Sequence, residues 1–292
     1  MNADYRIRAT AADGLLRTVA VNTTVTARQA QQVHDAWPLA AAAMGRLLSV
    51  AAILAGDVKA AGARLTVEVD GQGPLGRVVA EVLEGDKLRA RVQHPQVELP
   101  LRDNGKFDVG QAIGIEGTFR VIRQEGAGRW YQSQVPLRTG EIGDDFLYYL
   151  TQSEQIPSAV SVGVLVGTDG LVTASAAVLV QALPGCPESL VEEVAARFQA
   201  LEQISRRVAD GDSLETLIRL VVPEPIHWAE AVPIAWACWC SEASVLEALK
   251  ALPATDLEEL IADGGAEVTC HYCRRRYPFS ASELAALKED RA

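Results

Sequence analysis

Four cysteines near the end of the chain constrain its folding more than any other feature. Cys238 and Cys240 form a Cys-x-Cys hook, and after twenty-nine intervening residues Cys270 and Cys273 form a Cys-x-x-Cys hook. Zinc favours four soft or borderline ligands in a tetrahedron, and each short hook supplies two sulfurs from one tight turn. The single residue inside the first hook is an uncommon spacing, which makes the set more diagnostic. The sequence therefore predicts that these four thiolates bind one zinc ion.

The segment that carries the hooks is short for an independent domain. A module of about sixty residues is only marginally stable on its hydrophobic core. Two short helices are predicted between the hooks, over residues 243–250 and 255–262. Structural zinc contributes roughly 10–16 kcal/mol in small finger peptides, which is comparable to the stability of a whole domain. Removal of the metal is therefore expected to unfold this module.

The cysteine pattern alone leaves open a permanent structural zinc site and a redox-sensitive one. The two cysteines of each hook are close enough in sequence to form a local disulfide, which would eject the metal. Arginines at 274–276 follow the second hook, and nearby cations favour the thiolate that oxidants attack, although a solvated surface run is an equally good interpretation. His271 is not expected to be a ligand, because four sulfurs already complete the tetrahedron. Cys186 is far from the hooks in sequence and is expected to be a bystander.

Composition argues against nucleic-acid and membrane partners. The 292-residue chain has a formal charge of −11, so its surface repels phosphate backbones and anionic membranes. The apolar stretch 160–183 is interrupted by Gly163, Gly167 and Gly170, and it predicts two strands and a turn rather than a membrane span. No secretory signal is visible at the N-terminus. With five cysteines and no export signal, the chain is expected in the reducing cytoplasm.

Residues 1–183 predict a mixed α and β core domain. Residues 64–70 alternate apolar and polar side chains, which is the period-2 pattern of a half-buried strand. Further strands are predicted over 76–82, 87–93, 117–124 and 130–136, and helices over 26–35, 38–54 and 144–151. The elements do not alternate regularly between strand and helix. The predicted fold class is therefore α+β.

A helical linker is predicted over residues 184–225, before a metal module at 226–292. Residues 188–210 read as one helix, and Asp212 or Ser213 as the cap of a shorter helix. Apolar side chains recur along the first helix at spacings of three and four. This linker stripe comprises Val191, Val194, Phe198, Leu201, Ile204 and Val208. A stripe of this kind is most often the core-facing side of a helix.

The sequence resembles the 33 kDa chaperonin family, the redox-regulated heat-shock holdases. The resemblance is carried by Cys-Trp-Cys-Ser at 238–241 and Val-Thr-Cys-His-Tyr-Cys at 268–273, followed by Tyr277 and Phe279. Upstream it includes Met-Gly-Arg-Leu-Leu at 44–48, Asp-Gly-Gln-Gly-Pro-Leu-Gly at 70–76, Thr-Gly-Glu-Ile at 139–142 and Tyr-Tyr-Leu-Thr-Gln-Ser-Glu-Gln-Ile-Pro at 148–157. It covers essentially the whole chain.

The resemblance implies an ATP-independent holdase chaperone that is inactive while reduced and bound to zinc. In the family, peroxide or hypochlorous acid forms a disulfide within each hook, here Cys238–Cys240 and Cys270–Cys273, and zinc leaves. The linker and the metal module then lose order, the protein forms a homodimer, and exposed apolar surface, here the linker stripe, holds unfolding client proteins. One departure is that Ser241 is followed by Glu-Ala-Ser at 242–244, which is more acidic than the arginine-bearing run expected there. It leaves ligation intact and bears on how readily the thiolates react.

No catalytic site is predicted, so the protein is not expected to be an enzyme. The glycine-rich segment 71–76 lacks the helix and the Lys-Ser/Thr ending of a phosphate loop, and Ser153 has no histidine nearby in sequence. Two other functions remain as alternatives. One is a thiol–disulfide oxidoreductase that uses the second hook, although such motifs usually begin a helix beside a βαβ core. The other is a static zinc module that binds protein or RNA, and the acidic charge argues against RNA.

Overall fold

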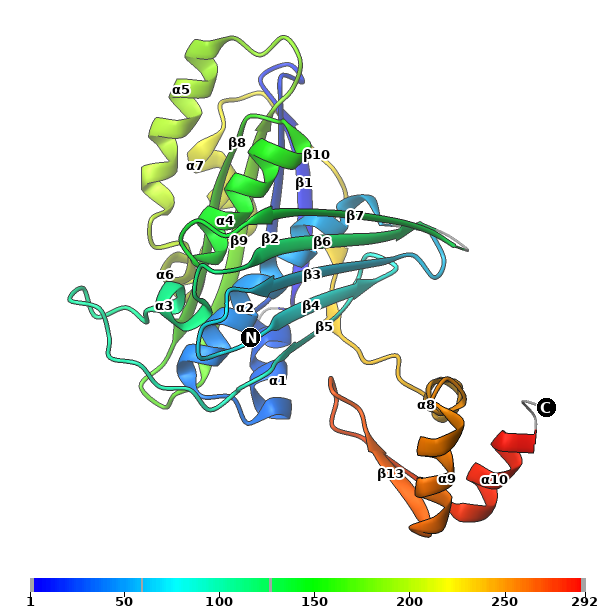
Figure 1. Ribbon diagram of the computed structural model, residues 1–292. Coiled ribbons are helices and arrows are strands. Elements are labelled where there is room, and N and C mark those ends of the chain that lie inside the picture. The colour runs from blue at the N-terminus through cyan, green and yellow to red at the C-terminus, as the bar shows by residue number, and fades with distance from the viewer. Residues whose placement is uncertain (1–2, 59, 126–127, 290–292) are drawn as a thin grey trace. The chain divides into compact units, whose positions relative to one another are not determined.

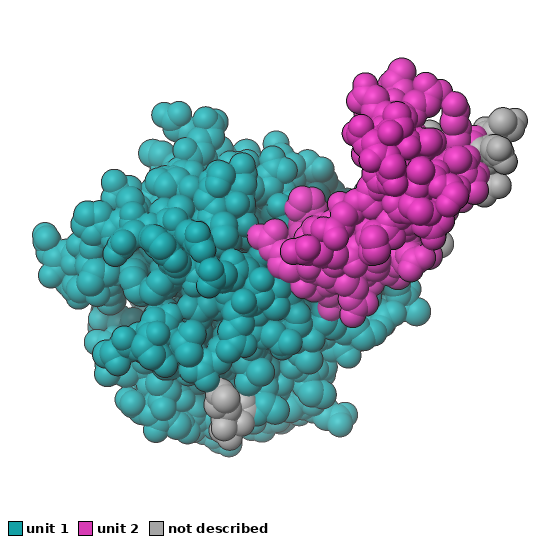
Figure 2. Space-filling model, turned by 90° about the horizontal axis from the view of Figure 1, so that it is seen from below, with its two compact units in different colours: residues 1–237 teal, residues 238–292 magenta. Residues whose placement is uncertain are grey.

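The computed structural model describes residues 3–58, 60–125 and 128–289. Contacts divide the chain into two compact units, residues 1–237 and 238–292 (Figures 1 and 2). The predicted division into a core domain at 1–183, a helical linker at 184–225 and a metal module at 226–292 stays a prediction. Within the described ranges, no helix is both long enough and apolar enough to cross a membrane.

The first unit is built on two sheets. One has the strand order β10-β1-β2-β9-β8, with β11 also paired to β1, and the other has the order β12-β5-β4-β3-β6-β7. The strands are β1 (Tyr5–Ala11), β2 (Leu16–Asn22), β3 (Arg64–Asp70), β4 (Val78–Leu83), β5 (Lys87–Val92), β6 (Thr118–Glu125), β7 (Arg129–Pro136), β8 (Ser158–Val166), β9 (Val172–Ala182), β10 (Ile226–Trp228), β11 (Val232–Pro233) and β12 (Ala235–Trp236). In the described part of the chain, β12 pairs in parallel with β5 and the other strand pairs are antiparallel. This confirms the α+β prediction.

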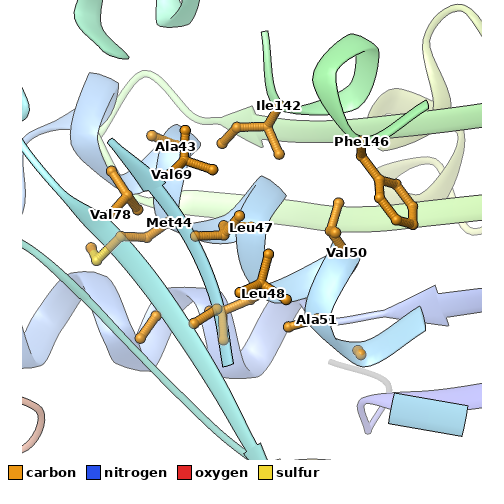
Figure 3. Packing of buried hydrophobic residues seen from close by; sticks show 14 of the residues in the cluster. Ala43, Met44, Leu47, Leu48, Val50, Ala51, Val69, Val78, Ile142 and Phe146 are labelled. Atoms are coloured by element: carbon orange, nitrogen blue, oxygen red, sulfur yellow. The ribbon is translucent and has the colours of Figure 1, made fainter. Parts of the chain in front are cut away.

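The helix α2 (Pro38–Leu54) lies at the centre of the main core. It packs against β8 and β9 of one sheet and against β4 and β5 of the other, which explains its many small and apolar residues. Figure 3 shows Leu47 and Leu48 of this helix among the side chains of the cluster. Gly45 allows close packing, because a Cβ there would lie 2.8 Å from Cγ2 of Val164 on β8. The small residues of α2 thus let two sheets share one buried helix.

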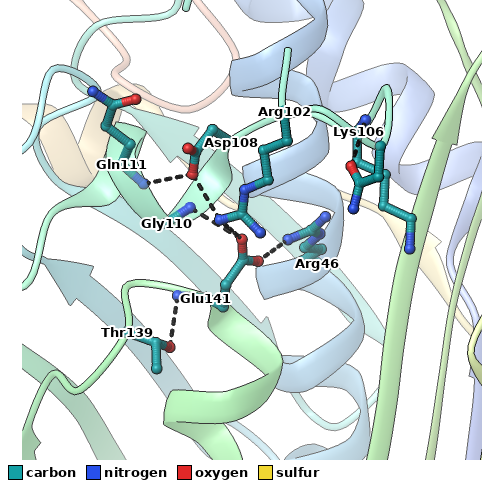
Figure 4. A network of polar contacts seen from close by, with 9 residues as sticks. Arg46, Arg102, Lys106, Asp108, Gly110, Gln111, Thr139 and Glu141 are labelled. Atoms are coloured by element: carbon teal, nitrogen blue, oxygen red, sulfur yellow. Dashed lines mark hydrogen bonds and ion pairs between the residues drawn. The ribbon is translucent and has the colours of Figure 1, made fainter. Parts of the chain in front are cut away.

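A network of ion pairs joins the loop before α3 (Val109–Ile113) to α2 and to α4 (Ile142–Tyr149) (Figure 4). Glu141 pairs with Arg46 of α2 and, at 2.7 Å, with Arg102. Arg102 also pairs at 2.6 Å with Asp108, which caps α3 by accepting a hydrogen bond from the Gln111 N–H. Each pair is partly exposed and contributes at most about 1 kcal/mol. The network therefore fixes the position of the loop more than it stabilises the fold.

The sequence pattern located most elements of this unit. The predicted strand 64–70 coincides with β3, and the stretch 160–183 forms β8, a turn and β9 as predicted. The N-terminal segment contains the strands β1 and β2 and the helix α1 (Thr24–His34), of which the sequence pattern predicted only the helix. A buried arginine obscures the alternation of β1: Arg6 is 3% exposed and donates hydrogen bonds to the carbonyls of Ala52 and Gly85.

Three helices of the linker pack on the sheet β10-β1-β2-β9-β8, called the first sheet below, and cover its face opposite α2. They are α5 (Glu188–Arg197), α6 (Ile204–Ala209) and α7 (Leu214–Val221). The predicted continuous helix 188–210 is wrong in one respect, because it is interrupted between α5 and α6. The Leu201 carbonyl leaves the helical ladder and accepts a hydrogen bond from the Ser161 hydroxyl of β8 at 2.8 Å. Of the two predicted caps, Ser213 is the one that caps α7, accepting from the Thr216 N–H.

The second unit is small. It contains α8 (Glu242–Lys250) and α9 (Ala254–Ala262), which confirm the two predicted helices. The hairpin β13 (Gly265–Thr269) and β14 (Arg276–Ser280) and the helix α10 (Ala281–Glu289) were not predicted. Its buried hydrophobic residues are Leu249, Leu257, Tyr277, Phe279, Leu284 and Leu287. A core of this size is a weak basis for independent stability.

Candidate metal centre

Each cysteine hook is held by its own local structure. The first hook lies between β12 and α8, and Ser241 directly after it caps α8 by accepting a hydrogen bond from the Ser244 N–H at 3.1 Å. The second hook lies at the tip of the β13–β14 hairpin. In that tip the Cys270 N–H donates to the Arg275 carbonyl at 2.9 Å, and the Arg274 N–H donates to the Cys270 carbonyl at 3.0 Å. Backbone contacts thus shape both hooks.

The structure brings all four predicted ligands together. The Sγ atoms of Cys238, Cys240, Cys270 and Cys273 lie within 4.8 Å of one another. Two contacts join one hook to the other: Cys238 to Cys270 at 3.7 Å and Cys240 to Cys273 at 3.3 Å. Sulfurs that each lie about 2.3 Å from a zinc ion in a tetrahedron are about 3.8 Å apart. The spacing of the donors therefore fits one tetrahedrally coordinated metal ion.

The thiols of this cluster differ in acidity. Burial alone would raise the pKa of Cys240, but hydrogen bonds from the Tyr277 hydroxyl, at 3.1 Å, and from the neighbouring thiols outweigh it and lower that pKa to about 7. Burial raises the pKa of Cys273 to about 12, and its hydrogen bond with Cys240 acts in the same direction. One sulfur therefore carries the negative charge easily, whereas four thiolates at this spacing need a divalent cation to balance them. The donor set fits such a cation.

Tyr277 contacts the cysteine cluster, and the sequence indicated this residue only through the family signature. It lies on β14, where the strand alternation places it in the core of the second unit, and the residue is 7% exposed. Its hydroxyl nevertheless reaches Cys240 across the module. The contact with the Tyr277 hydroxyl and the nearby charges of Cys240 and Cys273 raise the pKa of Arg275. Arg275 of the arginine run therefore interacts with the cluster.

Other candidates from the sequence lie outside the cluster. His271 is exposed on the hairpin tip, and Cys186 packs against the apolar cluster of the linker helices. Neither belongs to the group of four potential metal ligands. The Cys-x-x-Cys hook occupies a hairpin tip and not the start of a helix. The oxidoreductase alternative therefore lacks its usual structural setting.

The linker stripe lies mostly against the first sheet. Val194, Leu201 and Ile204 are buried, and Phe198 and Val208 are partly buried in the same apolar cluster. Val191 is half-buried outside that cluster, where Leu190 takes part instead. The sequence stripe also omitted α7, whose Leu214, Leu217, Ile218 and Val221 are buried there.

A short extended segment connects the linker to the first hook. The strands β10 and β11 pair with β1, and β12 pairs with β5. The Ala237 N–H then donates to the Leu88 carbonyl of β5 at 2.9 Å. Ala237 is the last residue of the first unit, and Cys238 is the first residue of the second. The first predicted metal ligand therefore lies two residues after β12, a strand of the core sheet.

Comparisons with known proteins agree on one family. The sequence profile of the Hsp33 protein family matches residues 4–280. A 33 kDa chaperonin of Bacillus pumilus is 37% identical over 288 residues, covering 98% of this chain and 99% of the relative. A 33 kDa chaperonin of Staphylococcus aureus strain Newman is 36% identical over 294 residues, covering 100% of both chains.

A solved structure has the same fold. The 33 kDa chaperonin of Thermotoga maritima, a heat shock protein 33 homologue, superposes with a TM-score of 0.89 at 34% identity, covering 99% of each chain. Proteins of this group are named chaperonins, and chaperones are not enzymes. Because the profile, the relatives and the fold agree over nearly the whole length, the chain belongs to the Hsp33 family of 33 kDa chaperonins.

Proposed function

We propose that the protein is a redox-regulated holdase chaperone. In its reduced state it binds one zinc ion through Cys238, Cys240, Cys270 and Cys273 and is inactive, and in its oxidised state it holds unfolding client proteins without ATP. The observation that carries the proposal is the convergence of four sulfurs, two from each hook, within 4.8 Å in a unit with a small core. Membership of the Hsp33 family supports it.

When bound, zinc supplies the divalent charge that stabilises the thiolates and holds the two hooks together. Oxidation within each hook forms the disulfides Cys238–Cys240 and Cys270–Cys273. For each disulfide, two thiolates lose two electrons to one molecule of hydrogen peroxide, which takes up two protons and leaves as two water molecules. Disulfide sulfurs carry no charge and bind zinc poorly, so the metal is released.

Loss of the metal would remove the main support of the second unit. The six buried hydrophobic residues in the described part of this unit give it little stability by themselves. Disorder of the second unit would begin at Cys238, directly after Ala237, whose N–H donates to the Leu88 carbonyl. The segment β10–β12, which joins the linker to the first hook, would then no longer be held at its C-terminal end. The linker helices would then leave the first sheet and expose the linker stripe together with its counterpart on α7.

In this proposal the exposed apolar side chains bind apolar segments of unfolding clients. The active form is a homodimer that acts in the cytoplasm during oxidative stress. Neither nucleic acid nor membrane is a partner, in keeping with the formal charge of −11. Clients are recognised by exposed apolar surface and not by sequence, because burial of apolar area is non-directional.

Light scattering of a thermally unfolding client enzyme tests the function. Peroxide-treated, zinc-free protein is expected to suppress aggregation, and the reduced zinc-bound protein is expected not to. The variant Cys186→Ser serves as a control, because Cys186 lies outside the metal cluster and should leave the switch unchanged. If oxidised, zinc-free protein protects no client, the proposal is wrong.

A further inference from the structure

Three arginines from two different sheets line one small cavity in the first unit. The cavity has a volume of about 60 Å³ and is bounded by Arg8 of β1, Arg17 of β2 and Arg123 of β6, with Glu154 and Gln181 beside them. Apolar side chains from the end of α2 and from β2 and β9 close its walls. Among the described residues, three guanidinium groups and one carboxylate share this cavity, in a chain whose formal charge is −11.

Arg17 is held in this cavity by a neutral group. Its Nε donates a hydrogen bond to Oε1 of Gln181 at 3.1 Å, and its Nη2 donates to the same oxygen. Gln181 is 2% exposed, and its amide NH₂ donates to the Ser158 hydroxyl at 3.3 Å, which directs Oε1 toward Arg17. Among the residues that the structure describes, Arg17 has no carboxylate partner. Gln181 therefore fixes the position of the Arg17 guanidinium group without balancing its positive charge.

The other two arginines are anchored differently. Arg123 forms an ion pair with Glu154 at 2.9 Å, so the Glu154 carboxylate balances one guanidinium group. Arg8 donates a hydrogen bond to the Gly56 carbonyl at 3.2 Å, just after the end of α2. The charge of Arg17 is therefore the one that remains for an anion to balance.

We propose that this cavity binds a tetrahedral oxyanion of the phosphate class. A single water needs roughly 10–15 Å³ of such space, so about 60 Å³ accommodates several waters or one small polyatomic anion. Guanidinium groups match phosphate oxygens with paired N–H donors. Arg8 and Arg17 come from one sheet and Arg123 from the other, so a bound ion contacts both sheets of the core. Binding to the folded state alone stabilises the first unit.

Calorimetric titration of the reduced full-length protein with inorganic phosphate tests the proposal, with sodium chloride of equal ionic strength as the reference. Arg17→Gln removes the unbalanced charge. Gln181→Glu instead supplies Arg17 with a carboxylate of nearly the same shape, and so fills the role of the anion while preserving the fold. Arg64→Gln is the matched control, since Arg64 is an exposed arginine of β3 outside the cavity.

The wild type and Arg64→Gln are expected to bind phosphate with the same affinity, and both cavity variants are expected to bind at least about tenfold more weakly. Sulfate is expected to displace phosphate, because charge and tetrahedral shape determine recognition. The proposal is overturned if the wild type binds no phosphate above the chloride reference. It is equally overturned if Gln181→Glu, folded as judged by circular dichroism, binds phosphate as tightly as the wild type.

Discussion

The Tyr277 hydroxyl donates a hydrogen bond to Sγ of Cys240 at 3.1 Å. The ring of the same tyrosine packs in the core of the second unit with Leu257 and Phe279. One side chain thus belongs both to the core and to the surroundings of the metal ligands. This contact explains why the fold of the module and its affinity for metal should depend on each other.

Tyr277→Phe removes the hydroxyl and keeps the ring. All four sulfurs remain, so the variant should still bind zinc, but the Cys240 thiolate loses a hydrogen bond that stabilises it. Loss of such a partner typically weakens metal affinity by about ten- to a hundredfold. Competition with a chromophoric chelator measures the affinity of the reduced protein.

The control for this variant is His271→Ala. His271 is exposed within the second hook and is not one of the four ligands, so its loss should leave zinc affinity unchanged. Equal affinities for Tyr277→Phe and the wild type would show that the hydroxyl does not support the metal site.

Removal of metal from the reduced protein should unfold the second unit and spare the core of the first. The described part of the second unit has six buried hydrophobic residues, whereas α2 lies in a large cluster between two sheets. Amide exchange after chelation is expected to lose protection in β13 and β14 and to keep it in α2 and β3. Persistent protection of the β13–β14 hairpin in metal-free protein would contradict the role assigned to the metal.

Gly163 controls how closely the linker approaches the first sheet. A Cβ at this position of β8 would lie 2.8 Å from Cγ2 of Ile204 and 3.1 Å from the hydroxyl of Ser205, both on α6. Overpacking of this kind typically costs about 1–3 kcal/mol. Gly163→Ala should therefore loosen α6 and allow part of the client protection without any oxidant, as measured by light scattering with reduced, zinc-bound protein.

Gly143→Ala is the matched control for that variant. A Cβ at Gly143 of α4 would lie 3.7 Å from Val162, which is ordinary contact. This variant should stay inactive until oxidised. If Gly163→Ala also stays inactive while reduced, the packing of α6 on β8 does not restrain the linker.

The carboxyl of Asp145 gives the first unit a defined pH dependence. It is buried and accepts hydrogen bonds from the N–H groups of Arg138 and Thr139, and burial raises its pKa above 3.8. A carboxyl whose pKa is higher in the folded state favours folding below its unfolded pKa. That contribution is lost as the pH rises through the folded pKa, by about 1.4 kcal/mol for each unit of the shift.

Asp145→Asn should remove this contribution, because the amide does not titrate. The difference in urea midpoint between variant and wild type is therefore expected to shift in favour of the variant as the pH rises from about 4 to 7. A difference that stays constant over this range would show that the Asp145 carboxyl titrates as it does in the unfolded chain.

Much of the fold could be predicted from periodicity and capping. Residues 64–70 alternate cleanly and form β3, and Ser213 caps α7, because both depend on local sequence alone. Other features depend on distant partners. The three short strands after α7 are defined by pairing with β1 and β5 and have no pattern of their own. The break after α5 depends likewise on the Ser161 hydroxyl.

The metal centre likewise combines features that local sequence predicts with features that depend on distant partners. The hooks are visible in the sequence because each pair of sulfurs is local, and the structure adds the contacts of 3.7 and 3.3 Å that join one hook to the other. The Tyr277 hydroxyl could not be placed from sequence, because the chain distance to Cys240 is 37 residues. The arginine cavity was missed for the same reason: Arg17 and Arg123 lie on different sheets.

Zinc content and zinc release measured together test the central claim most directly. Reduced protein is expected to contain one zinc per chain, and peroxide should transfer that zinc to a chromophoric chelator as the four thiols disappear. Cys270→Ser should lose most of the metal, and Cys186→Ser should retain it. Reduced protein without stoichiometric zinc, or a Cys270→Ser variant with unchanged metal content, would contradict the account.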